Sequence, residues 1–221
     1  SLAIIGGGYI GIEFASMMTS FGSKVTVVAS GPHILDREDP DIAAIYEKSL
    51  QDRGVTILTG VLAKSGSKQG NTITVELSDG SSVSAEKVLV AAGRIPNTKG
   101  IGLEEAGVTL VQRGFISVDD HLRTNLDGVW AAGDCAGTPM FTHASWNDYR
   151  IIREQMDGVS LDDPRTSKAG RLIPWALFAE PELGRIGLNE TEAKEQGLDV
   201  LVASIDTAAI PRAKTMRDTT G

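Results

Sequence analysis

The chain has 221 residues, 41% of them hydrophobic and 23% charged, and its 29 Asp and Glu against 21 Lys and Arg give a net charge of −8. This is an ordinary globular composition, long enough for one large or two smaller domains, and without clustered Lys and Arg it argues against nucleic acid as a partner. No apolar run approaches the roughly 20 residues of a membrane-spanning helix, and the first residues lack the basic region of a secretory signal, so we expect a cytoplasmic protein without membrane contact.

The first elements alternate between strand and helix patterns. Leu2–Gly6 has the apolar run of a buried strand, Ile10–Phe21 carries apolar residues at helical spacing, and Lys24–Ala29 (KVTVVA) is again a buried strand pattern. This order predicts a βαβ unit.

Residues 4–15, IIGGGYIGIEFA, join the first strand to the first helix through the motif Gly6-x-Gly8-x-x-Gly11. In a dinucleotide fingerprint, these three glycines allow a tight turn, close approach of a pyrophosphate, and close packing of helix on strand. The helix N-terminus adds N–H groups and positive partial charge. A turn that binds nothing is the alternative, but the position between strand and helix favours a nucleotide site.

The end of the second strand bears on which nucleotide is bound. NAD sites usually place an acid there for the ribose 2′-hydroxyl, whereas this chain has Ala29 and Ser30. Ser30, His33 and Arg37 could accept a 2′-phosphate, so the sequence favours NADP over NAD. A solvated loop is the alternative for His33 and Arg37.

The next segment predicts a helix and several short strands. The helix is expected over Asp41–Arg53, with Asp39 as N-cap, Pro40 at its first position and Gly54 beyond its end. The expected strands, with antiparallel hairpins around a Ser-Asp-Gly turn, are Thr56–Leu58, Thr72–Leu77, Ser81–Val83 and the buried Val88–Ala92.

After Pro96 the pattern becomes rich in loops, with short strands expected between Ile101 and Asp120. The later predictions are a strand at Gly128–Ala132, a helix at Thr142–Met156, a linker at Ser160–Lys168, strands at Pro174–Phe178 and Gly184–Leu188, and a helix that Asn189 and Glu192 open and Gly197 ends.

Four segments in this order, GGGYIGIEFA, VTVV, VLVAAGRIPNT and TNLDGVWAAGDCAG, resemble the FAD-dependent pyridine nucleotide-disulfide oxidoreductases, which include dihydrolipoamide dehydrogenase, glutathione reductase and mercuric reductase. The resemblance covers essentially the whole chain. Within that family, IPRAKTMRDTTG at residues 210–221, together with Ala29, most resembles the mercuric-reductase-like branch.

The resemblance implies an α/β fold in three parts. A Rossmann-like NAD(P)-binding domain with an antiparallel β-hairpin insert is expected at 1–98, the second part of an FAD-binding domain at 99–168, and the start of an α+β dimerisation domain at 169–221. The expected cofactors are FAD and NAD(P).

The resemblance also implies roles for individual residues. Asp134 would bind the ribityl chain of FAD and Gly133 would make room for it, while the helix that begins near Thr142 would direct its dipole at the flavin. Glu13 would lie near the nicotinamide, and Tyr9 would gate the nicotinamide site or simply pack on its helix. The candidate cofactor-binding residues are Gly6, Gly8, Tyr9, Ile10, Gly11, Ser30, Arg37, Gly93, Gly133, Asp134, Met140, Phe141 and Thr142.

Several parts of the family pattern do not stand in their expected places. These are the amino-terminal FAD fingerprint with its C-x4-C disulfide and the carboxyl-terminal His-x4-Glu pair; His33 and Glu38 have that spacing by coincidence. Cys135 is the single cysteine, which excludes an intrachain disulfide or a cysteine-based zinc cluster, and it is expected to pack beside FAD.

We therefore expect an internal segment of a longer, homodimeric flavoprotein. The parent enzyme would pass a hydride from NAD(P)H to FAD and on to a disulfide, another small molecule or a metal ion. The alternative is a stand-alone dinucleotide-binding module without redox activity.

Overall fold

The computed structural model describes every residue from Ser1 to Gly221, and the chain forms two compact units. Unit 1 consists of residues 1–93 and 176–221, and unit 2 of residues 94–175. The last part of the chain, which the sequence assigns to a separate domain, thus packs with the nucleotide-binding segment.

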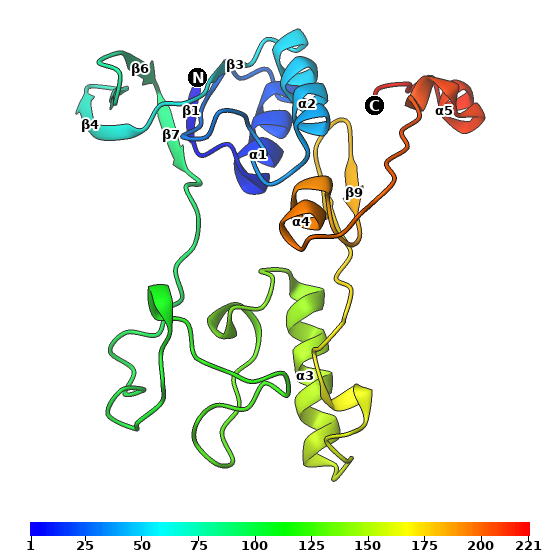
Figure 1. Ribbon diagram of the computed structural model, residues 1–221. Coiled ribbons are helices and arrows are strands. Elements are labelled where there is room, and N and C mark those ends of the chain that lie inside the picture. Colours follow the sequence, from blue (N-terminus) through cyan, green and yellow to red (C-terminus); the bar gives the residue numbers. More distant parts are fainter. The chain divides into compact units, whose positions relative to one another are not determined.

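A four-stranded parallel sheet forms the centre of unit 1 (Figure 1). Its strands lie in the order β3-β2-β1-β7, and they are β1 (Leu2–Ile5), β2 (Val25–Val28), β3 (Thr56–Leu58) and β7 (Lys87–Val90). Helices α1 (Tyr9–Ser20) and α2 (Pro40–Asp52) connect β1 to β2 and β2 to β3. The predicted βαβ unit and the predicted helix after Asp39 are both confirmed.

The two faces of the parallel sheet are covered by different elements because side chains alternate along each strand. Ile4 lies against α1, with its Cγ2 atom 3.4 Å from the position that a Cβ on Gly11 would take. Ala3 belongs to the other face, where a buried cluster joins the two sheets of unit 1. Its buried members are Ala3, Val28, Val75, Leu77, Val83 and Ala85.

The second sheet of unit 1 is antiparallel and has three strands, β4 (Ala63–Gln69), β5 (Thr72–Leu77) and β6 (Ser82–Ala85). The predicted turn between the last two is present, with the carboxylate of Asp79 accepting the Ser81 N–H at 3.0 Å. Strand β4 was not predicted. Its sequence AKSGSKQ is exposed throughout, so no apolar alternation marks it, and pairing with β5 alone makes it a strand.

Helix α1 forms as predicted, but its apolar row does not face the core. The residues buried on α1 are Gly11, Ile12, Ala15 and Ser16. Ile10, Phe14 and Met17 are instead 39%, 38% and 42% exposed. Small residues occupy the side of α1 that faces the sheet, because α1 packs closely on β1 there.

Unit 2 is built around α3 (Thr142–Met156), which forms over the predicted range. Three short helical turns accompany it, η1 (Gln112–Gly114), η2 (Gly133–Ala136) and η3 (Pro164–Thr166). The predicted strand at Gly128–Ala132 is wrong. Only Trp130 pairs there, in an isolated bridge with Arg123, because no neighbouring strand extends the ladder.

The carboxyl-terminal part contains the hairpin β8 (Trp175–Leu177) and β9 (Leu183–Arg185), then α4 (Glu190–Glu195), η4 (Thr207–Ala209) and α5 (Pro211–Met216). Asn189 and Glu192 form the predicted capping box at α4. Asp39 occupies the N-cap position of α2 without a side-chain capping bond; its carboxylate accepts the Glu190 N–H at 3.2 Å. No helix is both long and apolar enough to cross a membrane.

Candidate functional site

The three fingerprint glycines are required for different reasons, which their surroundings make visible. Gly6 has a φ of +122°, and a Cβ there would lie 2.3 Å from the carbonyl oxygen of Ala91. A Cβ on Gly11 would lie 2.0 Å from the carbonyl oxygen of Gly6. Both distances are too short for any side chain, so Gly6 and Gly11 serve the packing of strand, turn and helix.

Gly8 differs, because a Cβ at this position would meet no atom within 4 Å. Its φ of −80° suits any residue, and it is the N-cap of α1 with no side-chain capping bond. Neither packing nor backbone strain therefore accounts for a glycine here. Open space over the N-terminus of a helix is what a pyrophosphate needs to approach the backbone, so the residues present fit a dinucleotide.

The first turn of α1 presents backbone amides to that space. The first helical bond is donated by the Ile12 N–H to the Gly8 carbonyl oxygen at 3.0 Å, so Tyr9 and Ile10 precede the intrahelical ladder. The first turn of α1 carries no acidic side chain that would offset the positive end of the helix dipole.

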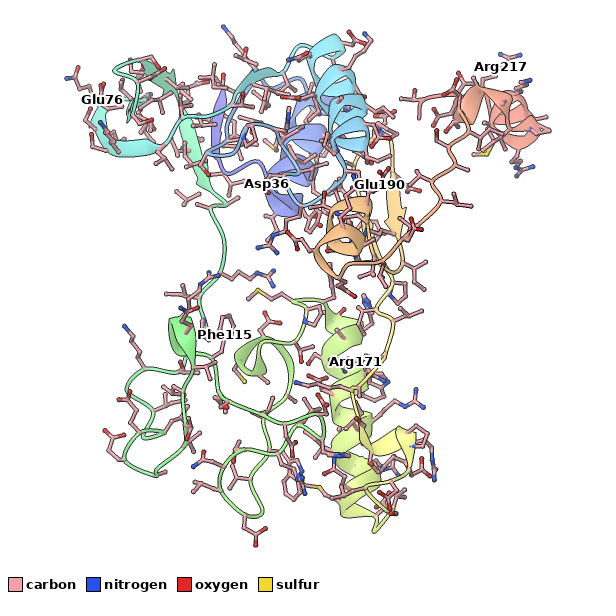
Figure 2. All side chains as sticks on the ribbon, viewed as in Figure 1. Asp36, Glu76, Phe115, Arg171, Glu190 and Arg217 are labelled. Atoms are coloured by element: carbon pink, nitrogen blue, oxygen red, sulfur yellow. The ribbon has the colours of Figure 1, made fainter.

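Ser30, His33 and Arg37 lie in the segment that leads from β2 to α2. All three are exposed, and His33 lies 3.8 Å from Glu47. Asp36 was not considered from the sequence. Its Oδ2 atom lies 3.1 Å from the position of a Cβ on Gly31, so a carboxylate does stand near the end of β2 (Asp36 is labelled in Figure 2).

Tyr9 is anchored by a carboxylate that comes from the loop after β2. Its hydroxyl donates to Glu38 Oε1 at 2.6 Å. Partial burial, then the bond and charge of Glu38, raise the pKa of Tyr9 well above its usual range. Burial also raises the pKa of Glu38, against the opposing effects of Tyr9 and Arg185. No role could be assigned to Glu38 from the sequence, because its partners are distant along the chain.

Glu13 also makes a long-range contact. Its Oε1 atom accepts the backbone N–H of Phe178 at 3.0 Å, and Ser16 Oγ accepts the Glu180 N–H at 3.1 Å. Helix α1 thereby holds the hairpin β8–β9 next to the fingerprint. The placement of Glu13 near a nicotinamide stays a prediction.

In unit 2, Gly133 and Asp134 begin the short helical turn η2. Gly133 has a φ of +71°, and a Cβ there would lie 2.8 Å from Ser145 Oγ on α3. Asp134 is about half exposed and accepts a 3.2 Å bond from Arg94 Nη1. Cys135 is partly buried and donates to the Ala132 carbonyl oxygen at 3.3 Å. An exposed carboxylate on a tightly packed turn fits the binding of a cofactor hydroxyl.

Asp148 on α3 fixes this turn, and the sequence did not reveal it. The carboxylate is fully buried and accepts the Gly133 N–H at 2.7 Å and the Thr138 hydroxyl at 2.6 Å. Arg171 donates to its other oxygen at 2.5 Å (Figure 2 labels Arg171 beside α3). Both oxygens of the Asp148 carboxylate therefore have hydrogen-bond partners, as a buried charge requires.

The start of α3 carries a row of aromatic rings. Phe141 stacks on His143 with ring centres 5.6 Å apart, and on Trp175 with ring centres 6.1 Å apart. Met140 and Phe141 are partly buried, and Thr142 and Gly93 are exposed. A cavity of about 310 Å³ lies farther along α3 and is lined by Arg150, Arg165 and Arg171 among others; it includes no predicted site residue.

Comparison with known families gives two matches. The model of the pyridine nucleotide-disulphide oxidoreductase family matches residues 1–148, and the model of that family's dimerisation domain matches residues 173–221.

Curated relatives agree with these matches. The chain is 40% identical over 220 residues to the probable pyridine nucleotide-disulfide oxidoreductase RclA of Escherichia coli, and 36% identical over 224 residues to a dihydrolipoyl dehydrogenase of Geobacillus stearothermophilus. All of the chain is aligned in both cases, with 49% and 47% of the relatives. The chain thus spans about half the length of these proteins.

Solved structures show the same similarity. The HOCl-induced flavoprotein disulfide reductase RclA from E. coli gives a TM-score of 0.87 at 40% identity, covering 100% of this chain and 50% of that one. LpdA from Mycobacterium tuberculosis gives 0.87 at 31% identity, with 100% and 47% coverage. These comparisons do not single out the mercuric-reductase-like branch. With its fingerprint, its Gly133-Asp134 turn and these matches, the chain belongs to the pyridine nucleotide-disulphide oxidoreductase family.

Proposed function

We propose that this chain is the NAD(P)H-binding part, with adjoining FAD-binding residues, of a flavoprotein that reduces a disulfide or a related acceptor. The observation that carries the proposal is the contrast among the fingerprint glycines. A Cβ added at Gly6 or Gly11 would lie 2.3 or 2.0 Å from a backbone oxygen, whereas a Cβ at Gly8 would meet no atom within 4 Å. A purely structural turn needs the first two glycines and does not need the third.

The residues of this chain would bind and orient the two cofactors. The amides at the start of α1 would hold the pyrophosphate of NAD(P)H, and Asp134 would hold the ribityl chain of FAD. When bound, NAD(P)H and FAD supply the redox chemistry, which is hydride transfer followed by electron transfer to the acceptor. The protein's part is binding, orientation and exclusion of water.

Arg94 would tune the FAD-binding carboxylate. It lies 3.2 Å from Asp134, and both side chains are about half exposed, so the pair is open to solvent and to competing partners. Such a pair contributes little to stability, about 0–1 kcal/mol. The carboxylate can therefore exchange Arg94 for a cofactor hydroxyl at small cost.

The preference between NADP and NAD depends on charges after β2. Ala29, Ser30 and Arg37 favour NADP, because no acid occupies the strand end and Arg37 is exposed. Asp36 opposes this preference, since a carboxylate beside Gly31 repels a 2′-phosphate and can accept a bond from a 2′-hydroxyl. Comparison of the NADPH and NADH affinities would decide which of these side chains sets the preference.

The acceptor, assembly and location of the parent protein are further parts of the proposal. The names of the relatives support a disulfide acceptor. The alternative is a metal ion acceptor, as in the mercuric-reductase-like branch, and a structure of RclA is described as a Cu(II) complex. The match to a dimerisation domain supports a homodimer. A cytoplasmic enzyme is the location that we propose.

A stand-alone dinucleotide-binding module is the second candidate, favoured only by the self-contained packing of the fingerprint. The test is NAD(P)H consumption by the longer flavoprotein with a disulfide acceptor, and with Cu(II) or Hg(II) in parallel. We expect acceptor-dependent consumption that Gly8→Ser slows at least tenfold at low nucleotide concentration. Nucleotide binding without consumption for any acceptor would favour the module instead.

A further inference from the structure

Unit 1 contains a buried carboxylate that has no part in the cofactor sites described above. Glu38 is 8% exposed and lies in the loop between β2 and α2. It is one of the few charged side chains buried in the chain. Buried charges are costly unless they are paired, so its partners indicate what holds it there.

Its partners come from two distant parts of the chain. The hydroxyl of Tyr9, at the first position of α1, donates to Oε1 at 2.6 Å. The guanidinium of Arg185, at the end of β9, lies 3.4 Å from both carboxylate oxygens and also pairs with Glu192. Glu38 therefore joins the residue that follows Gly8 to the segment that matches the dimerisation domain.

The neighbours of Glu38 are held by the same segment. Asn189 Nδ2 donates to the Arg37 carbonyl oxygen at 2.9 Å, and the Glu190 N–H donates to Asp39 Oδ1 at 3.2 Å (Figure 2 labels Glu190). The residues on either side of Glu38 are thus hydrogen bonded, and so is the Glu38 carboxylate. The backbone around Glu38 therefore has little freedom. A carboxylate fixed in this way can define where the ring of Tyr9 lies.

We propose that Glu38 is the positioning residue for Tyr9 in the nicotinamide nucleotide site, and that Arg185 holds Glu38 in place for this purpose. The proposal rests on the proposed function, because it assigns the nucleotide site to the N-terminus of α1. Glu38 itself touches no cofactor in this account. It acts by holding the ring of Tyr9 in one orientation before the nucleotide arrives, so that binding does not have to order the ring.

The chain offers a matched control for the Tyr9 hydroxyl. Tyr46 on α2 donates its hydroxyl to the Pro181 carbonyl oxygen, also at 2.6 Å. Tyr46 lies outside the fingerprint. Tyr9→Phe and Tyr46→Phe thus each remove one tyrosine hydroxyl bond of 2.6 Å, but only Tyr9 lies at the proposed nucleotide site.

The experiment measures KM for NAD(P)H and kcat of the longer, FAD-loaded protein in five forms: wild type, Y9F, E38M, the double variant and Y46F. We expect Y9F and E38M each to raise KM about 5- to 10-fold, which corresponds to one lost hydrogen bond of ordinary strength, with little change in kcat. We expect the double variant to match the single variants, since both remove the same bond. Y46F should leave KM unchanged.

Glu38→Gln supplies the conservative test, because its amide oxygen can still accept the Tyr9 hydroxyl; we expect KM near that of wild type. If E38M does not fold, as thermal melting and flavin content would show, the comparison of Y9F with Y46F carries the test. The positioning role would be overturned, with the proposed function left standing, if the KM effects added in the double variant or if Y46F raised KM equally. A wild-type protein that consumes no NAD(P)H would overturn the proposed function as well.

Discussion

The contrast between Gly11 and Gly8 leads to a prediction that separates folding from binding. A Cβ at position 11 would lie 2.0 Å from the Gly6 carbonyl oxygen, where an ordinary contact is above 3 Å, so strand and helix must move apart by about 1 Å. Overpacking of this kind costs about 1–3 kcal/mol. A central value of about 2 kcal/mol corresponds to a fall in Tm of roughly 4–8 °C for a chain of this size.

Gly8→Ser is the partner variant. Its Cβ meets nothing within 4 Å, and Ser is at least as good an N-cap as Gly, so we expect Tm to change by less than about 1 °C. The added side chain stands where the pyrophosphate must approach, and we expect at least a tenfold loss of NAD(P)H affinity, about 1.4 kcal/mol.

The two assays are thermal melting and calorimetric titration with NAD(P)H on the same preparations. Gly11→Ala should lower Tm, whereas Gly8→Ser should lower affinity alone. The reasoning would be refuted if Gly8→Ser bound nucleotide as tightly as the wild type, or if Gly11→Ala melted at the wild-type temperature.

Three further predictions concern charge and protonation. Asp148→Ala leaves Arg171 without its buried partner and should cost about 3–5 kcal/mol in unfolding free energy, measured by denaturant titration; a loss below about 1 kcal/mol would show that the pair is dispensable. Asp36→Asn should raise the ratio of NADPH to NADH affinity, and an unchanged ratio would place Asp36 outside the ribose site. The pKa of Tyr9 and that of Tyr46 are raised above the usual 10.0, so each stabilises the fold below pH 10 and loses this contribution only as pH rises through its higher folded-state pKa. Tyr9→Phe should therefore leave the tyrosinate absorbance rise near pH 10 unchanged in the folded protein; a smaller rise would mean that Tyr9 ionises normally.

The parts of the fold set by local pattern were predictable from the sequence. The strand, glycine turn and helix at residues 2–20 follow from apolar periodicity and the spacing of glycines, and α3 from its helical pattern. The capping box at Asn189 is likewise a local signal. Each of these features depends on residues that are neighbours in sequence.

Features that depend on tertiary pairing were not predictable in the same way. Strand β4 is polar and exposed, and it exists because β5 offers a ladder, whereas residues 128–132 look like a strand but have no ladder to join. On α1, close packing against β1 turned the small residues inward and left Phe14 exposed.

The candidate site divides along the same line. The glycines, Asp134 and the start of α3 could be named from motifs, but Asp148 and Glu38 could not. The partners of Glu38 are 29 and 147 residues away, and no spacing rule connects them. Asp36 was overlooked because the acid of an NAD site is expected directly at the strand end. Asp36 lies six residues beyond Ser30, and the loop folds back so that its carboxylate lies near the end of β2.

The most direct test of the central claim is anaerobic addition of NADPH and of NADH to the longer flavoprotein, with the flavin absorbance band followed in time. The account predicts that at least one nucleotide bleaches the band in the wild-type protein, and that Gly8→Ser slows this bleaching at least tenfold at low nucleotide concentration. A band that neither nucleotide bleaches, or one that Gly8→Ser bleaches at the wild-type rate, would contradict the assignment of this segment as the NAD(P)H-binding part of a flavoprotein reductase.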